Sequence, residues 1–116
     1  MKINSAAVIG TGFIGTVHVE SIRRTGVHVK GVLAGNAQST QAGATKLHVE
    51  KAYESLDQIC DDSDVSVVHV TSPNALHYEQ VKQLLTAGKH VVCEKPLALS
   101  AKEGKELVEL AKKTGL

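Results

Sequence analysis

The chain has 116 residues, of which 42% are hydrophobic, 3% aromatic and 22% charged, and its formal net charge is +1. This length suits one domain with an aliphatic core, which we expect to span residues 1–116. Because the charges are balanced, the sequence lacks the excess of Lys and Arg that is typical of nucleic-acid-binding or membrane-surface proteins. With no apolar membrane span, no signal peptide and no metal-type spacing of histidines, we expect a cytoplasmic, metal-free protein in which Cys60 and Cys93 are reduced.

Short apolar runs alternate with amphipathic segments along the whole chain. Strands are predicted at 2–9, 27–33, 49–52, 65–70 and 90–93, and helices at 13–25, 37–46, 55–60, 75–87 and 101–114. Asn74 is a predicted N-cap, and Ser100 with Glu103 is a predicted capping box. Strands alternating with helices imply parallel pairing and right-handed crossovers, hence an α/β fold with a doubly wound parallel sheet.

A glycine-rich segment follows the first strand and matches G-x-G-x-x-G without a gap. The first glycine permits a tight turn, the second lets the backbone approach a pyrophosphate, and the third lets the helix pack closely. The helix N-terminus then offers free N–H groups to phosphates. A purely structural turn is the alternative, but the flanking strand and helix favour a dinucleotide site. The candidate cofactor-binding residues here are Gly10, Thr11, Gly12, Phe13, Ile14 and Gly15.

The end of the second predicted strand departs from the usual dinucleotide-binding pattern. An acidic residue about 20 positions beyond the glycines usually binds the adenine ribose hydroxyls. This chain has Ala34 at that place, followed by Gly35 and Asn36. Without a carboxylate here, the 2′-phosphate of NADP would meet no repulsion. However, no arginine follows in the sequence to bind that phosphate. The predicted cofactor is therefore NAD or NADP, with a lean towards NADP.

Two further loops follow predicted strands on the same sheet edge, and we expect them to enclose the nicotinamide half of the cofactor. His77, in the first turn of its helix, is expected to point to solvent or substrate. The ammonium of Lys95 can donate a hydrogen bond to a carbinol oxygen, or relay its proton as hydride leaves. Partial burial and a positive nicotinamide would both lower the pKa of Lys95, although a solvated lysine at a strand end is the plainer alternative. The candidate cofactor-binding residues of these loops are Thr71, Ser72, Pro73, Asn74, His77, Glu94, Lys95 and Pro96.

Taken together, G-x-G-x-x-G, T-S-P-N-x-x-H and E-K-P resemble the Gfo/Idh/MocA family of NAD(P)-dependent oxidoreductases. The resemblance covers all 116 residues and matches the N-terminal Rossmann domain of that family. It implies that Lys95 sits by the nicotinamide and assists catalysis, while Glu94 and Pro96 shape the loop. It also implies that Pro73 and Asn74 line the cofactor cleft.

The same resemblance implies an oxidoreductase that transfers hydride between NAD(P) and the CH–OH group of a sugar, inositol or related polyol. The alternative is a non-catalytic module that senses NAD(P). Family members continue into an α+β domain that supplies most of the substrate pocket, so we expect a cofactor domain with little activity of its own. Apolar surface left exposed by the missing domain favours a homo-oligomer.

Overall fold

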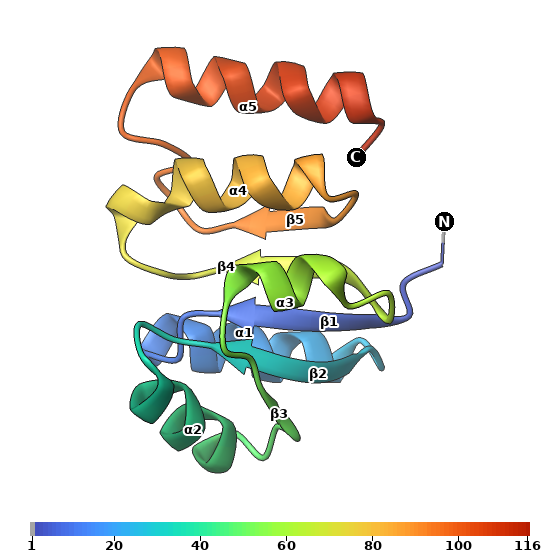
Figure 1. Ribbon diagram of the computed structural model, residues 1–116, viewed down its shortest axis with the longest axis vertical. Coiled ribbons are helices and arrows are strands. Elements are labelled where there is room, and N and C mark those ends of the chain that lie inside the picture. The colour runs from blue at the N-terminus through green and yellow to red at the C-terminus, as the bar shows by residue number, and fades with distance from the viewer. Residues whose placement is uncertain (1) are drawn as a thin grey trace.

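The computed structural model describes residues 2–116 and shows one parallel sheet between two layers of helices (Figure 1). The five strands lie in the order β3-β2-β1-β4-β5, which confirms the predicted doubly wound α/β fold. The strands are β1 (Ser5–Ile9), β2 (His28–Leu33), β3 (Lys51–Ala52), β4 (Val65–Val70) and β5 (His90–Cys93). The helices are α1 (Phe13–Arg24), α2 (Ala37–Lys46), α3 (Leu56–Asp61), α4 (His77–Thr86) and α5 (Ala101–Thr114), with a 3-10 turn η1 at Asn74–Leu76.

The central strand β1 is buried along its whole length and divides the core in two. Because successive side chains of a strand point to opposite faces, Ala7 packs with Ile59 of α3 and Leu84 of α4 on one face. On the other face, Val8 packs with Val19 of α1. The helices α1 and α3 accordingly lie on opposite sides of the sheet in Figure 1.

The start of α4 differs from the predicted helix over residues 75–87. The chain first makes the 3-10 turn η1, in which Leu76 donates its backbone N–H to the carbonyl of Pro73 at 2.9 Å. Asn74 lies inside this turn and its side chain caps nothing, so the prediction of an Asn74 N-cap is wrong. Tight i→i+3 bonding takes the place of side-chain capping here.

The cap of α5 follows the prediction in part. The hydroxyl of Ser100 accepts the backbone N–H of Glu103 at 3.2 Å. Within residues 2–116 the return bond, from the backbone of Ser100 to the side chain of Glu103, is not formed. The helix ends at Gly115 in the left-handed conformation (φ 76°), as expected of a glycine C-cap.

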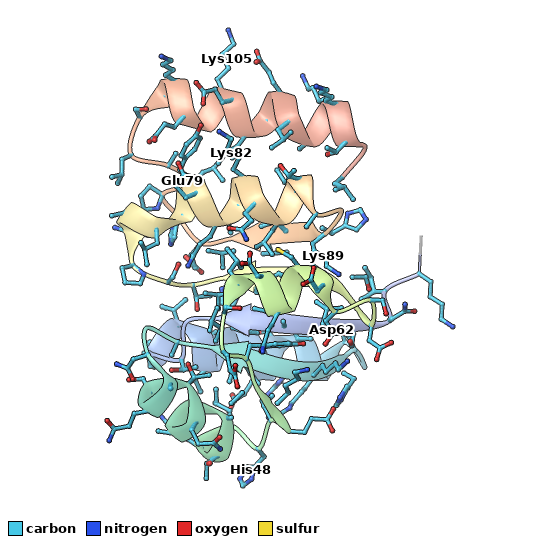
Figure 2. The ribbon with its side chains drawn as sticks, viewed as in Figure 1. His48, Asp62, Glu79, Lys82, Lys89 and Lys105 are labelled. Atoms are coloured by element: carbon cyan, nitrogen blue, oxygen red, sulfur yellow. The ribbon has the colours of Figure 1, made fainter. Side chains whose placement is uncertain are left out.

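A network of buried and partly buried polar groups centres on Asp62, at the amino-terminal edge of the sheet. Its carboxylate accepts the hydroxyl of buried Tyr53 and the ammonium of Lys30, both at 2.8 Å. Lys89 donates to the carbonyls of Asp62 (2.7 Å) and Val65 (2.8 Å), and Figure 2 shows Asp62 and Lys89 at this edge. Although burial raises the pKa of Asp62, hydrogen bonds from Lys30 and Tyr53 lower it to about 2.

Candidate functional site

The carboxyl ends of the neighbouring strands meet at one edge of the sheet, where the arrowheads point in Figure 1. The residues that follow β1, β4 and β5 each donate a backbone N–H to the last residue of an adjacent strand. These bonds run from Gly10 to Leu33 (2.8 Å), from Thr71 to Ile9 (2.7 Å) and from Glu94 to Val70 (2.9 Å). The sheet therefore places the glycine turn between the loops after β2 and β4, with the Lys95 turn beyond.

The three glycines of the turn meet different surroundings. A Cβ at Gly10, whose φ is +96°, would lie 2.5 Å from the carbonyl oxygen of Thr71. At Gly15 it would lie 2.0 Å from the carbonyl oxygen of Gly10, whereas at Gly12 it would meet nothing within 4 Å. Gly10 and Gly15 are thus required by the fold itself. The backbone at Gly12 is left open to a ligand.

Helix α1 begins at this turn without a side-chain cap. Its N-cap residue is Gly12, and no acidic residue lies in its first turn. The side chains of Asn36, Ser55 and Ser100 cap α2, α3 and α5. The first N–H groups of a helix have no partner within the helix, so the start of α1 is free to bind an anion.

A cleft of about 490 Å³ opens over these strand ends, a volume within the usual range for small-molecule sites. It brings together many of the predicted cofactor-binding residues: Gly10, Thr11, Gly12, Ala34, Gly35, Thr71, Ser72 and Pro73. The remainder of its lining is Ile9, Leu33, Ser39, Leu76 and Gln80. Ser72 and Gln80 are hydrogen-bonded through their side chains. Gln80 lies one helical turn beyond His77, and that spacing is the sequence clue that could have identified it.

Several predicted cofactor residues lie outside this cleft lining. Phe13 and Ile14 form the exposed first turn of α1, with the Phe13 side chain 79% exposed. Gly15 is buried behind Gly10. The Asn36 side chain caps α2, and Asn74 belongs to η1. Of these residues, Asn36 has a side chain that serves the fold, through its cap of α2.

His77 does not point to solvent or substrate, and that prediction is wrong. Its side chain is 1% exposed and lies between the two loops. Nδ1 is 2.7 Å from the carbonyl oxygen of Pro96, and Nε2 is 2.8 Å from that of Ser72. Carbonyl oxygens only accept, so a neutral ring donates to one of them and a protonated ring to both. His77 therefore links the loop after β4 to the turn after β5.

The Glu94-Lys95-Pro96 turn follows β5, and its Lys95–Pro96 peptide bond is cis. Glu94 Oε1 lies 2.8 Å from His18 Nε2, and Oε2 accepts the backbone N–H of Lys95 at 3.2 Å. The hydrogen bond from His18, assisted by the one from the Lys95 backbone, lowers the pKa of Glu94 despite its partial burial. Lys95 itself is exposed, so the expected partial burial of its side chain is wrong for this chain.

Sequence reasoning also missed two histidines beside this turn. His18 lies on α1, three residues after the last glycine of the motif, and its Nδ1 is 2.9 Å from Nδ1 of His69 on β4. The clue for His69 is an ionisable ring within an otherwise aliphatic strand end, Val67–Val70. No comparable clue in the sequence joins either ring to Glu94.

An order of β3-β2-β1-β4-β5 with an uncapped glycine turn at the central strand defines a Rossmann dinucleotide-binding domain. A family model described as "Oxidoreductase family, NAD-binding Rossmann fold" matches residues 5–116. The chain thus belongs to the Gfo/Idh/MocA oxidoreductase family.

Similar proteins include sugar and inositol oxidoreductases. The chain is 37% identical to the 1,5-anhydro-D-fructose reductase of Ensifer adhaerens over 84% of this chain and 29% of the reductase. It is 35% identical to the inositol 2-dehydrogenase/D-chiro-inositol 3-dehydrogenase of Lactiplantibacillus plantarum over 97% of this chain and 33% of that enzyme. The solved structure of GenD2 from gentamicin A biosynthesis, in complex with NAD, has a TM-score of 0.91 at 30% identity, covering 100% of this chain and 33% of GenD2.

The chain thus spans about a third of the length of these relatives. Across residues 2–116, no helix is long and apolar enough to cross a membrane. In the same residues, no group of three or more His, Cys, Asp or Glu side chains is placed to hold a metal ion.

Proposed function

We propose that the cleft binds a nicotinamide dinucleotide in one orientation. The pyrophosphate lies on the glycine turn, the adenine ribose near Ala34, and the nicotinamide between the loops at Ser72 and Lys95. The observation that carries this proposal is the uncapped start of α1 beside the open backbone of Gly12, within one cleft. Free N–H groups at a helix start attract phosphate oxygens.

The proposed chemistry is the oxidation or reduction of a CH–OH group. When bound, the nicotinamide exchanges a hydride with the carbinol carbon. Lys95 donates a hydrogen bond to the carbinol oxygen and helps to move its proton. Similar proteins include an anhydrosugar reductase and an inositol dehydrogenase, which supports a sugar, inositol or related polyol as the substrate class.

The proposed cofactor is NAD or NADP, with a lean towards NADP. Because Ala34 has no carboxylate, it can neither accept hydrogen bonds from the ribose hydroxyls of NAD nor repel the 2′-phosphate of NADP. The hydroxyl of Thr40 is already engaged, because it accepts the N–H of Ala34 and donates to the carbonyl of Asn36, both at 2.8 Å. Ser39 lines the cleft and is the side chain left to bond a phosphate there.

Titration with NADH and with NADPH, followed by nicotinamide fluorescence, tests the binding proposal directly. Both should saturate on the 116-residue chain, with NADPH binding at least as tightly as NADH. If neither cofactor binds while the chain is folded by circular dichroism, the proposal fails. A clear preference for NADH overturns only the lean towards NADP.

Turnover by this chain alone is proposed to be small, because the relatives it matches are about three times as long. Incubation with NAD or NADP and inositol should produce little reduced cofactor, and appreciable turnover would contradict the proposal. The alternative is a non-catalytic module that senses NAD(P). It would bind the cofactor, but Lys95 would take no part in catalysis. We further propose a cytoplasmic location and a homo-oligomer.

A further inference from the structure

A series of three polar side chains connects α1 to the turn that carries Lys95. His69 contacts His18 through the two Nδ1 atoms at 2.9 Å, and His18 contacts Glu94 at 2.8 Å. Glu94 in turn accepts the backbone N–H of Lys95. We propose that His18 is a positioning residue that holds the Lys95 turn against the helix of the glycine motif, and that His69 orients the ring of His18. Its catalytic relevance rests on the function proposed above.

The contacts join segments that are far apart in sequence, by 51 residues for His18–His69 and 76 for His18–Glu94. His69 pairs in register with Val8 of β1 and Val92 of β5, so it projects from the interior of the sheet. The two rings meet edge to face, with centroids 5.2 Å apart and planes at 83°. The sheet is thus a rigid support for the ring of His18.

The His18–Glu94 contact is partly shielded from water. Their side chains are 15% and 32% exposed, and shielding of this kind strengthens a hydrogen bond between charged or polar groups. His18, which contacts both His69 and Glu94, is a largely enclosed link between α1 and the Lys95 turn. Loss of its contact with Glu94 would therefore loosen the turn rather than the helix.

The protonation states of the three groups are mutually compatible. The His18 hydrogen bond lowers the pKa of Glu94, and an ionised carboxylate only accepts, so Nε2 of His18 carries a hydrogen. Burial, with a smaller contribution from His18, lowers the pKa of His69 to about 4, so His69 is neutral at pH 7. A neutral His18 accepts the Nδ1–H of His69, and a protonated His18 donates to it. The arrangement therefore holds in either charge state of His18.

The exposed side chain of Lys95 depends on this support. Within residues 2–116 its ammonium makes no hydrogen bond or ion pair, so its position follows from the backbone of the turn. On one side, Glu94 is held by His18. On the other, the carbonyl of Pro96 is held by buried His77. The residues immediately before and after Lys95 are thus both anchored by histidines.

Two substitutions at one position test the proposal on the 116-residue chain. The side-chain amide nitrogen of Gln can take the place of Nε2, and that of Asn the place of Nδ1. His18→Gln should keep the contact with Glu94, whereas His18→Asn should lose it. In His18→Asn, the pKa of Glu94, measured by carboxyl ¹³C titration, should rise towards its ordinary value. Amide hydrogen exchange at Lys95 should become several-fold faster.

Further variants keep the test independent of folding and of cofactor binding. His69→Phe should also make amide hydrogen exchange at Lys95 faster, but by less than His18→Asn does. If His18→Asn fails to fold, faster exchange in His69→Phe supports the proposal and unchanged exchange contradicts it. His90→Asn, on β5 without a side-chain hydrogen bond in the described chain, is the control and should change neither readout. The proposal is overturned if His18→Asn matches wild type, or if His18→Gln behaves like His18→Asn. Both readouts are taken without cofactor, so failure of NADH or NADPH binding would be seen separately.

Discussion

Gly15 packs so closely against Gly10 that a Cβ on Gly15 would lie 2.0 Å from the carbonyl oxygen of Gly10. That oxygen belongs to the backbone of the turn and cannot move aside as a flexible side chain could. The same carbonyl accepts the hydroxyl of Thr71 at 3.1 Å. The approach of α1 to the sheet and the shape of the turn are thus set by one contact.

Gly15→Ala should destabilise the fold and abolish dinucleotide binding. Overpacking a tight contact typically costs about 1–3 kcal/mol of unfolding free energy, and a displaced α1 would carry its free N–H groups away from the cleft. Urea unfolding and NADPH fluorescence titration measure the two effects. A Gly15→Ala chain with wild-type stability and affinity would contradict the role assigned to this contact.

Gly12→Ala is the matched substitution, because its Cβ enters open space at an ordinary φ of −76°. Stability should stay within about 0.5 kcal/mol of wild type, while cofactor affinity should fall about tenfold, or about 1.4 kcal/mol. The added methyl would occupy the space proposed for the pyrophosphate. Unchanged affinity would place the pyrophosphate elsewhere.

Ala34→Asp should weaken NADPH binding and leave NADH binding intact or improved. A carboxylate at the end of β2 would repel a 2′-phosphate and accept bonds from ribose hydroxyls. We expect a change of about tenfold in the ratio of the two dissociation constants. Ala34→Asn, of similar size without the charge, is the control and should shift the ratio less. Equal shifts for Asp and Asn would show that size, not charge, decides.

Asp62 should make the fold sensitive to acid. Its pKa is lowered from 3.8 to about 2 in the folded chain, by hydrogen bonds from Lys30 and Tyr53 that outweigh burial. The ionised form is therefore the one stabilised by folding. Its contribution is complete above about pH 4 and is lost as the pH falls towards 2. Partial solvent screening of the Lys30 pair reduces the expected loss to about 1–2 kcal/mol of unfolding free energy.

Asp62→Asn should remove this acid-dependent loss while lowering stability at pH 7. Urea unfolding at a series of pH values measures both effects. Asp64→Asn is the control, because Asp64 contacts the same Lys30 but is 73% exposed, and it should change stability by less than about 0.5 kcal/mol. If Asp62→Asn and Asp64→Asn both lose stability in parallel with wild type as the pH falls, a group other than Asp62 causes the acid-dependent loss.

Self-association should involve the exposed edge of β5 and the segment after it. Val92, Leu97 and Leu99 are 45%, 38% and 66% exposed there, and an unpaired strand edge offers free backbone groups to a second chain. Val92→Lys should reduce the fraction of dimer in sedimentation velocity. Val17→Lys, a comparably exposed valine of α1, should not. A wild-type chain that is monomeric at all concentrations would refute the proposed homo-oligomer.

The edge of the sheet that carries the site could be predicted from sequence, because the chemistry-bearing residues follow strands directly. Gly10, Thr71 and Glu94 each come immediately after a predicted strand, and parallel strands end at one edge. The same rule could not orient side chains. His77 lies in the first turn after a loop, and only the folded contact with the carbonyl of Pro96 shows that it turns inwards.

Long-range pairs were beyond the reach of sequence patterns. Periodicity describes neighbours a few residues apart, whereas His18 and Glu94 are separated by 76 residues. The exposure of Lys95 is likewise a property of how the turn sits on the sheet. At Asn74 a local preference failed instead, because the 3-10 turn Asn74–Leu76 took the place of the predicted side-chain cap.

The polar network around Asp62 has a consequence for how this domain can change. It joins Tyr53, Lys30 and Lys89 to Asp62, near the amino-terminal edge of the sheet. The cleft is lined by residues at the carboxyl-terminal edge, which is the opposite end of the strands in Figures 1 and 2. Tolerance of acid and the proposed choice of dinucleotide would therefore depend on separate sets of residues. We expect selection to be able to adjust one of these properties while leaving the other as it is.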